Sequence, residues 1–390
     1  MSTILRVVLD ADLGEEPRRM IQEQVGYLDE AVTDVELDGD TLRVVTSHPV
    51  EGLQTGVQEL VDRTVRSFRR VRQVELASHD PALAVDRDPE PALIARGDLV
   101  HVGHGTASFQ GRLLAVMDGL DRVFAAEGHR LGGVEQRHPT TVPAASLSAN
   151  GYLKSFPHHA ILAAPARPGI DSLRALGDGP DAEGTYPSSA MDRPAQVLAP
   201  TVCHHTFEWL RGRTVASSPT ILTAVGRCHR HEGAATDGLR RLQTFTMREI
   251  VVVAGADEVT DIRQGLIDHA VGLALEWGLR ARVVTASDPF FASTEDRKRA
   301  YQSMMKLKYE LQLWLPYAGE WLACASFNHH QSSLVDVYDI TGADERVLHS
   351  GCVGYGLERW ALAINAQHGT DDARWPTPLR DVLAGGDTAG

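Results

Sequence analysis

The sequence lacks the two glycine-rich motifs that commonly hold nucleotides in proteins. No G-x-x-x-x-G-K-[ST] run occurs, and no G-x-G-x-x-G opens a helix after a strand. Long apolar runs are also missing, because no stretch approaches the roughly 18 apolar residues of a membrane span. The short apolar run near the N-terminus is interrupted by charged residues. These absences argue against a P-loop or Rossmann nucleotide site, a secretory signal and a membrane anchor.

Positive charge and cysteine are both scarce. The 390 residues include 38 Lys and Arg against 52 Asp and Glu, which gives a net charge of -14. Broad nucleic-acid binding needs a basic face that displaces counterions from phosphates, so this balance argues against it. Four cysteines in a chain of this length are typical of a reducing compartment. The sequence therefore predicts a soluble cytoplasmic enzyme with a large core, whose thiols are free or bound to metal.

The chain is expected to contain a small first domain, a linker and a large second domain. Residues 1–76 predict the order β-α-β-β-α, since two amphipathic stretches flank a strand pair that turns at Asp-Gly. Residues 77–98 are rich in Pro, Asp and Ala and are interpreted as a linker. Residues 99–390 alternate helical and strand patterns, which favours an α+β fold with an antiparallel sheet flanked by helices.

Two local predictions follow from this pattern. Strands are expected at 246–255, 281–285, 309–316, 320–327 and 346–353, and helices at 106–128, 257–277 and 293–307.

The last helix of the first domain carries a basic stripe. We interpret it as a solvated face, and the alternative is a docking site for an acidic partner or RNA. The stripe consists of Arg63, Arg66, Arg69, Arg70 and Arg72.

The stretch GRCHRHEGAATDGLRRLQTF, residues 226–245, indicates a nucleotide site of another kind. Arg230 and Arg241 lie on either side of a small-residue loop, and arginine can hold phosphates through paired hydrogen bonds. Glu232 can accept a hydrogen bond from an exocyclic amine, and Phe245 can stack on a base.

A second stretch, SGCVGYGLERWALA at residues 350–363, adds to this nucleotide site. Its glycines let a ligand approach the backbone closely. Arg359 follows them at the start of a predicted helix, where its guanidinium can clamp a terminal phosphate.

The order of these stretches resembles that of class II aminoacyl-tRNA synthetases. The helix at 106–128 with a following strand that contains Pro143 resembles motif 1. Arg-x-Glu, loop, Arg-x3-Phe resembles motif 2, and Gly-x-Gly-x-x-Arg resembles motif 3. LAPTVC, GLRRLQTFTMRE and the pair YELQLWLP and EWLACAS resemble the seryl-tRNA synthetase branch. The resemblance covers roughly residues 106–370, and it implies the class II fold for residues 99–390 and a homodimer formed through the motif 1 element.

The resemblance also implies an ATP site that uses magnesium. Arg230 would neutralise the α-phosphate, and Arg241 and Arg359 would hold the γ-phosphate. Glu232 and Phe245 would bind the adenine ring. Glu320 would be the magnesium ligand, although Ala323 stands where the synthetases often have a serine.

The thiols depart from the common pattern of the branch. Cys203 replaces the glutamate of a T-x-E element, and Glu249 and Cys324 are expected on neighbouring strands. Two thiolates and a carboxylate with a fourth position open are typical of a working zinc site, which could bind the amino group of a small amino acid. This set resembles zinc-dependent seryl-tRNA synthetases and amino acid:carrier protein ligases. The alternative is that Cys203 and Cys324 are core residues, as Cys228 and Cys352 are expected to be.

Histidines are frequent around these stretches but are not expected to bind metal. His204 and His205, like His329 and His330, are adjacent, and neighbours on a strand point to opposite faces. At most one of each pair could reach the metal, so these histidines, with His229 and His231, are interpreted as satisfied pocket or surface residues.

Several features favour a carrier protein over tRNA as the acceptor. The first domain is short and shows no sustained heptads, the motif 2 loop is short and the net charge is negative. The resemblance then implies activation of glycine, alanine or serine as an adenylate, followed by transfer to the phosphopantetheine thiol of a carrier protein. Three alternatives stay open: a seryl-type aminoacyl-tRNA synthetase, a ligase that passes the aminoacyl group to a small amine, and a catalytically inactive paralogue.

Overall fold

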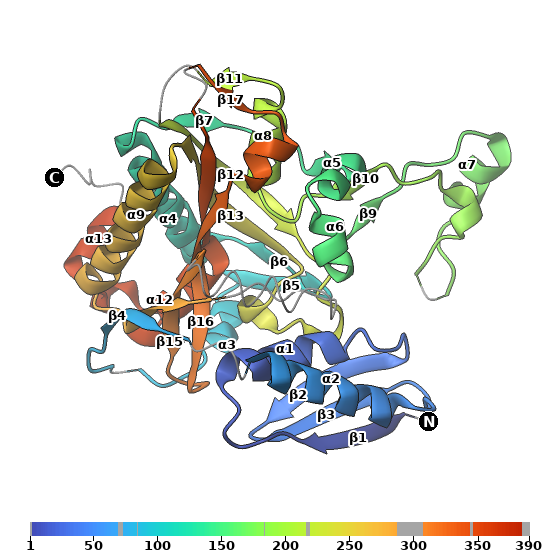
Figure 1. The fold of residues 1–390 in the computed structure, drawn as a ribbon. Coiled ribbons are helices and arrows are strands. Elements are labelled where there is room, and N and C mark those ends of the chain that lie inside the picture. Colours follow the sequence, from blue (N-terminus) through green and yellow to red (C-terminus); the bar gives the residue numbers. More distant parts are fainter. Residues whose placement is uncertain are drawn as a thin grey trace.

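The structure is a computed structural model that describes residues 2–68, 73–83, 85–182, 184–215, 219–286, 307–343 and 346–383. An eight-stranded sheet forms its centre (Figure 1). All neighbouring strands in it are antiparallel except one edge pair, β7 with β12. In spatial order the strands are β4 (Glu75–His79), β14 (Ala281–Thr285), β15 (Lys308–Leu315), β16 (Glu320–Gln331), β18 (His349–Gly356), β13 (Thr244–Ala254), β12 (Thr220–His229) and β7 (Val134–Gln136).

Three helices cover one face of this sheet, and a fourth, at the C-terminal end, packs against the first of them (Figure 1). They are α4 (Gly111–Arg130), α9 (Ala256–Glu276), α12 (Leu357–His368) and α13 (Thr377–Leu383). In α4 the buried apolar residues recur at helical spacing, as in Leu113, Met117, Leu120 and Phe124, so one stripe of the helix packs on the sheet. The expected α+β class, an antiparallel sheet flanked by helices, is confirmed.

Strand β13 shows how the sheet separates a core face from a second face. Ile250 and Val252 belong to the core beneath the helices, whereas Val251 and Val253 belong to a different cluster. Side chains alternate between the faces of a strand, so Glu249 points away from α4 together with Val251. Arg248 points toward α4, where its fully buried guanidinium donates to Asp121.

The end of β18 leads into α12. Gly356 precedes the helix, and Gly369, with φ of 80°, ends it in a left-handed conformation that glycine adopts without strain. The strand and helix expected in 346–363 are therefore present.

The first domain has the expected element order. Its elements are β1 (Thr3–Val8), α1 (Glu15–Val25), β2 (Val32–Asp38), β3 (Thr41–Thr46) and α2 (Leu53–Phe68). They form a three-stranded sheet in the order β1-β3-β2, with a core of its own that includes Ile21, Leu42 and Val57. The basic stripe is described in part, since Arg69, Arg70 and Arg72 lie outside the described residues.

Two sequence expectations need correction, and a third is left untested. Residues 77–98 are more than a linker, because β4 joins the edge of the large sheet and residues 90–95 form helix α3 (Glu90–Ala95). The helix expected at 106–128 begins later, since β6 (Thr106–Phe109) forms a hairpin with β5 (Leu99–Gly103) before α4 starts. The helix expected at 293–307 falls almost entirely outside the described residues.

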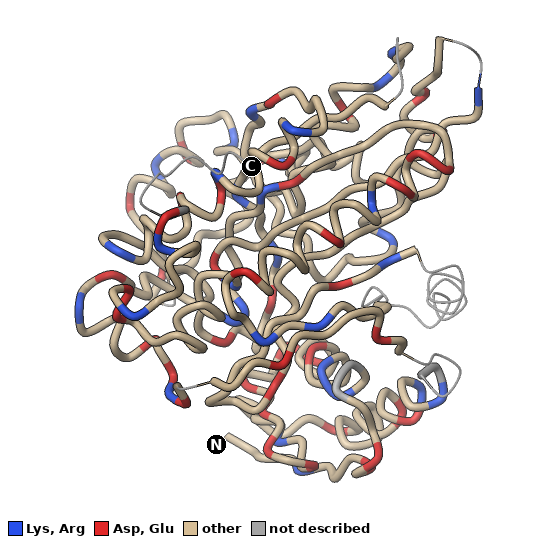
Figure 2. The backbone as a smooth tube through the Cα atoms, turned by 90° about the vertical axis from the view of Figure 1, so that its left-hand side faces the viewer, with Lys and Arg blue, Asp and Glu red and all other residues tan. Residues whose placement is uncertain are grey.

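Charge is spread over the molecule. Figure 2 shows Lys and Arg interspersed with Asp and Glu along the described chain, consistent with the net charge of -14. None of the helices in the described part of the chain has the length and apolar character needed to cross a bilayer.

Candidate active site

A cavity of about 640 Å³ lies on the face of the sheet away from α4 and α9. Its lining comes from β13, β15, β16 and β18, from the loop after β12, and from helices α6 (Tyr152–Ser155), α8 (Cys203–Leu210) and α12. Two residues of α1, Arg19 and Glu23, also line it. Charged side chains therefore converge on one hollow from segments far apart in the sequence.

The arginines of one end of the cavity lie where the sequence places them. Arg230 follows β12 directly, donates from Nε to the carbonyl of Pro200 at 3.1 Å, and has its guanidinium 5.2 Å from the centre of the Phe245 ring. Phe245 is on β13, the partner strand of β12. The guanidinium of Arg230 is thus held by a backbone oxygen at Nε and by the face of an aromatic ring, and Arg230 lines the cavity.

Arg241 and Glu232 lie on either side of the loop after β12. Nη1 of Arg241 is 3.6 Å from the Glu232 carboxylate. Arg241 also forms an ion pair with Glu23 of the first domain, and both of these side chains are about 15% exposed. Burial raises the pKa of Glu232, a rise that Arg241 opposes and Glu23 reinforces.

Arg359, near the start of α12, is oriented by backbone oxygens. Its Nε donates to the carbonyl of Arg240 at 2.9 Å and its Nη1 to that of Ala323 at 3.0 Å. These bonds fix the guanidinium between the loop after β12 and strand β16, within the cavity lining. The structure thus brings Arg230, Arg241 and Arg359 together with Glu232 and Phe245, as the sequence predicts.

Glu320 lies apart from these residues. It begins β16, does not line the cavity, and accepts a hydrogen bond from Arg240 at 2.7 Å. The carboxylate on the hairpin that does line the cavity is Glu310 of β15, which pairs with Lys308 at 3.2 Å. Burial raises the pKa of Glu310, but Lys308 and Arg19 outweigh this and lower it. The expected role of Glu320 as a magnesium ligand therefore has no geometric support in this conformation.

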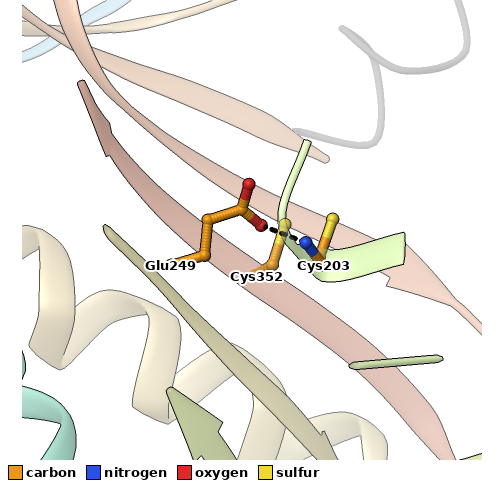
Figure 3. A group of neighbouring side chains, drawn as sticks. All are labelled: Cys203, Glu249 and Cys352. Carbon is orange, nitrogen blue, oxygen red and sulfur yellow. Dashed lines mark hydrogen bonds between the residues drawn. The ribbon is translucent and has the colours of Figure 1, made fainter. Parts of the chain in front are cut away.

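At the other end of the cavity, two thiols and a carboxylate meet. Sγ of Cys203, a carboxylate oxygen of Glu249 and Sγ of Cys352 all lie within 4.8 Å of one another, and all three residues are buried (Figure 3). Cys203 begins α8, Glu249 is on β13 and Cys352 is on β18. Among the described residues, this is the group whose geometry suits a metal ion.

Backbone groups orient the carboxylate of this cluster. The N–H groups of Val202 and Cys203 donate to the two oxygens of Glu249, at 2.9 and 3.0 Å. Burial nevertheless raises the pKa of Glu249 to about 7. A hydrogen bond from Cys203 lowers the pKa of Cys352, and His330, whose Nε2 is 3.5 Å from its sulfur, lowers it further. The cluster thus concentrates groups that carry negative charge when ionised, which a bound cation would neutralise.

The structure corrects the third thiol of the expected metal site. The side chain of Cys324 belongs to the core beneath the helices, and its Sγ donates to the carbonyl of Leu322 at 3.3 Å. The pairing of β15 with β16 skips Cys324, since Leu311 pairs with Ala325 and Gln312 with Ala323. This β-bulge shifts the register by one residue, so the alternation expected from the sequence breaks at Cys324.

The sequence predicts Cys352 as a core residue, and its place in the cluster corrects that interpretation. A usable signal was present in SGCVGYG, because residues 352, 354 and 356 share one face of a strand. If Gly354 and Gly356 face a ligand, Cys352 must face the same way. The assignment of Cys228 to the core holds, since it is fully buried beside Val202 and Ala224.

The expected strand geometry for His204 and His205 is wrong, because both lie on α8. Nδ1 of His204 lies 3.1 Å from the side-chain amide nitrogen of Asn150. Burial lowers the pKa of His204 to about 3, so this ring is a neutral hydrogen-bonding wall of the cavity. Asn150 and Tyr152, which complete this wall from the segment around α6, were not identified from the sequence.

Comparison with known proteins identifies the family of this chain. Residues 191–368 match the family described as tRNA synthetase class II core domain (G, H, P, S and T). The chain is 34% identical over 258 residues to amino acid–[acyl-carrier-protein] ligase 1 of Bradyrhizobium diazoefficiens, covering 65% of this chain and 78% of that protein. This chain belongs to the class II aminoacyl-tRNA synthetase-like family. Within it, the chain lies on the seryl-tRNA synthetase branch, near these ligases.

Further similarities agree with this placement. Ligase 2 of the same organism is 32% identical over 305 residues, covering 76% of this chain and 90% of that protein. A crystal structure of M. kandleri SerRS in complex with A. aeolicus tRNASec superposes with a TM-score of 0.71 at 24% identity, covering 99% of this chain and 78% of that one. At that identity the structural likeness supports the fold alone. The similarity to the two ligases, together with the family match, shows that this chain is an ATP-dependent amino acid ligase.

Proposed function

We propose that this class II synthetase-like ligase activates a small amino acid, glycine, alanine or serine, as its adenylate and transfers it to the phosphopantetheine thiol of a carrier protein. The observation that carries the proposal is the arrangement of one cavity, with three arginines at one end and the cluster of Cys203, Glu249 and Cys352 at the other. A similar relative of this chain is named an amino acid–[acyl-carrier-protein] ligase.

The donor set of the cluster fits zinc. Thiolate and carboxylate are common zinc ligands, and three protein ligands with a fourth position open are typical of working zinc sites. Zinc held by Cys203, Glu249 and Cys352 would supply a Lewis acid for the α-amino group of the substrate. The amides of Val202 and Cys203 hold the Glu249 carboxylate toward the sulfurs and fix its orientation.

The arginines would carry the nucleotide chemistry. Phe245 would stack on adenine and Glu232 would accept a hydrogen bond from its amino group. Arg241 and Arg359 would hold the terminal phosphates. Arg230 would neutralise charge that grows on the α-phosphate as the amino acid carboxylate attacks it, an effect that typically lowers a barrier by a few kcal/mol.

Two transfers then complete the reaction. A carboxylate oxygen of the amino acid forms a bond to the α-phosphorus, and pyrophosphate leaves with the electrons of the broken P–O bond. A thiol of the carrier next attacks the carbonyl carbon of the mixed anhydride, loses its proton, and AMP leaves. No protein nucleophile is needed, so the residues of the cavity act by positioning the reactants.

Recognition of the amine and the carboxylate does not by itself select the size of the amino acid. An amine and a carboxylate are common to all amino acids, and one methylene changes binding by only about 1–3 kcal/mol. Tyr152, His204 and Met247 line the cavity together with the cluster, and we propose that these side chains limit the room for the side chain of the substrate. Trp314 and Trp321 of the neighbouring hairpin pack on each other and do not line the cavity, so they do not set this size limit.

Amino acid-dependent pyrophosphate exchange tests the activation step. Each of the twenty amino acids is offered with ATP and magnesium to zinc-loaded protein and to protein treated with a chelator. We expect exchange with glycine, alanine or serine that the chelator abolishes and added zinc restores. Exchange that is strongest with a large amino acid, or that is unaffected by removal of zinc, would contradict the proposal.

A second candidate acceptor is tRNA. It is favoured by Arg63 and Arg66 on α2 and by the fold shared with a SerRS solved with tRNA. The negative net charge of -14 disfavours it. Charging of a tRNA pool, with no loading of a carrier, would support this second candidate.

We also propose a homodimer formed through α4 and β8 (Thr141–Pro143), which correspond to the motif 1 element. A light-scattering mass equal to two chains is expected. A mass equal to one chain would contradict this arrangement.

A further inference from the structure

Helix α1 lies on the side of the first domain that faces the second (Figure 1), and two of its residues line the cavity. Arg19 and Glu23, one helical turn apart, lie in the cavity lining beside the loop after β12. The first domain has its own hydrophobic core, and Arg19 and Glu23 lie on the face of α1 that is turned toward the second domain. The proposed reaction leaves this contact without a role.

The contact between the first domain and the loop after β12 includes apolar and aromatic packing as well as ion pairs. Gly26, after α1, lies against Ala234 of the loop, which packs on the core of the first domain. Tyr27 lies against Gly233 and donates from its hydroxyl to the carbonyl of His231. The ring of Tyr27 also meets that of His158 edge to face, with centroids 5.2 Å apart. The loop that carries the proposed ATP residues therefore packs directly against the C-terminal end of α1 and the residues that follow it.

Four alternating charges run from α1 into the cavity. Arg19 lies 3.9 Å from Glu23, Glu23 pairs with Arg241, and Arg241 lies 3.6 Å from Glu232. Glu23 and Arg241 are each about 15% exposed, so water screens their attraction only in part. Burial raises the pKa of Glu23, but Arg241 and Arg19 outweigh it and keep this carboxyl ionised.

Glu23 engages one corner of the Arg241 guanidinium. The hydrogen bond to Glu23 comes from Nη2, whereas Nη1 lies beyond hydrogen-bond distance of Glu232. A guanidinium has five N–H donors, so a carboxylate on one corner leaves others for a phosphate. Arg241 also lies near Arg359, whose pKa is lowered by burial and by the charges of Arg241 and Arg19. A fixed carboxylate offsets this repulsion and holds Arg241 in the cavity.

We propose that the first domain is part of the ATP site, and that Glu23 of α1 is the positioning residue that holds Arg241 where it can bind the terminal phosphates. This inference rests on the proposed function, since it assigns Arg241 to ATP. It gives residues 1–76 a purpose within the active site itself, through a side chain that the second domain does not supply.

Full-length variants test the role of Glu23. Glu23→Gln removes the charge, Glu23→Asp keeps it on a shorter side chain, and Glu59→Gln is the matched control, an exposed glutamate on α2 of the same domain. The KM for ATP, the KM for the amino acid and kcat are measured by pyrophosphate exchange, with thermal unfolding in parallel. We expect Glu23→Gln to raise the KM for ATP about tenfold, with Glu23→Asp in between and Glu59→Gln unchanged. The KM for the amino acid should stay within about twofold, because that substrate lies at the far end of the cavity.

Three results would overturn the proposal. A KM for ATP equal to that of the Glu59→Gln control would leave Glu23 without a role. A lower KM would mean that Glu23 competes with the phosphates for Arg241. An equal rise in the KM for ATP and the KM for the amino acid, together with lower thermal stability, would mean that the contact only supports the fold.

Failure of the proposed function is distinguishable from failure of this inference. If none of the twenty amino acids supports pyrophosphate exchange by the wild-type protein, the proposed function fails. Calorimetric titration with the non-hydrolysable analogue α,β-methylene-ATP then still decides the role of Glu23. Weaker binding of the analogue to Glu23→Gln than to Glu59→Gln supports the positioning role, and equal or tighter binding overturns it.

Discussion

Serine replacement of two buried cysteines separates the two possible metal sites. The structure predicts that Cys352→Ser loses zinc, because Cys352 lies within 4.8 Å of Cys203 and Glu249. Cys324→Ser should keep zinc, because the thiol of Cys324 points to the carbonyl of Leu322, a hydrogen bond that a serine hydroxyl can replace. The two variants carry the same chemical change on neighbouring strands of one sheet, so each serves as the control for the other.

The magnitude follows from typical zinc energetics. Structural zinc sites bind with about 10–16 kcal/mol, so one of three protein ligands accounts for about 4 kcal/mol if the shares are equal. A loss of about 4 kcal/mol weakens binding nearly a thousandfold. At an equal concentration of a competing chelator, Cys352→Ser should therefore lose its metal under conditions in which the wild type and Cys324→Ser retain theirs.

Metal content by mass spectrometry after chelator titration, with pyrophosphate exchange on the same samples, measures both consequences. Thermal unfolding of each variant shows whether it is folded. Retention of zinc by a folded Cys352→Ser, or its loss from a folded Cys324→Ser, would refute the reasoning from the bulge in β16.

Three further predictions concern charged residues. Arg230→Ala should lower kcat for pyrophosphate exchange by about 10²–10³-fold, as removal of a charge-stabilising donor usually does; an unchanged kcat would exclude its role at the α-phosphate. Arg248→Met should destabilise the protein by about 3 kcal/mol, measured by urea unfolding, because it leaves Asp121 and Glu135 without their buried partner. Burial pushes the pKa of Glu135 upward, but hydrogen bonds from Arg248 outweigh it and depress the pKa. Glu135 therefore stabilises the fold above its ordinary pKa of about 4.3, and this contribution is lost as the pH falls through the depressed value. Glu135→Gln should accordingly show a shallower loss of thermal stability below pH 5, and an acid limb identical to the wild type would contradict the assignment.

The large elements of the fold could be predicted from the sequence because their patterns are long and local. The strand at 246–255 and the helix at 257–277 differ from β13 and α9 by one or two residues at each end. That Arg230, Arg241 and Arg359 come together in one cavity also follows from the sequence, since each stands near a strand end or a glycine. These signals depend on neighbours in the chain and survive folding unchanged.

The features that escaped prediction depend on contacts between distant segments. A bulge at Cys324 inserts one residue into β16, and nothing in EWLACASF marks which residue is the extra one. The pairing of Glu23 with Arg241 joins residues 218 positions apart, so it depends on how one domain docks on the other. Glu320 was expected at magnesium from its place on the hairpin, but Arg240 pairs with it in the structure. Such outcomes are set by packing, which local patterns do not encode.

The measurement that tests the proposed function most directly is the intact mass of a carrier protein after reaction. Zinc-loaded protein, ATP, magnesium and a mixture of all amino acids are incubated with a phosphopantetheinylated carrier, with the unmodified carrier as the control. We predict a discrete mass gain on the modified carrier alone, equal to the residue mass of glycine, alanine or serine. No gain on the carrier, with a tRNA pool charged in a parallel reaction, would contradict the proposal and favour the aminoacyl-tRNA synthetase alternative.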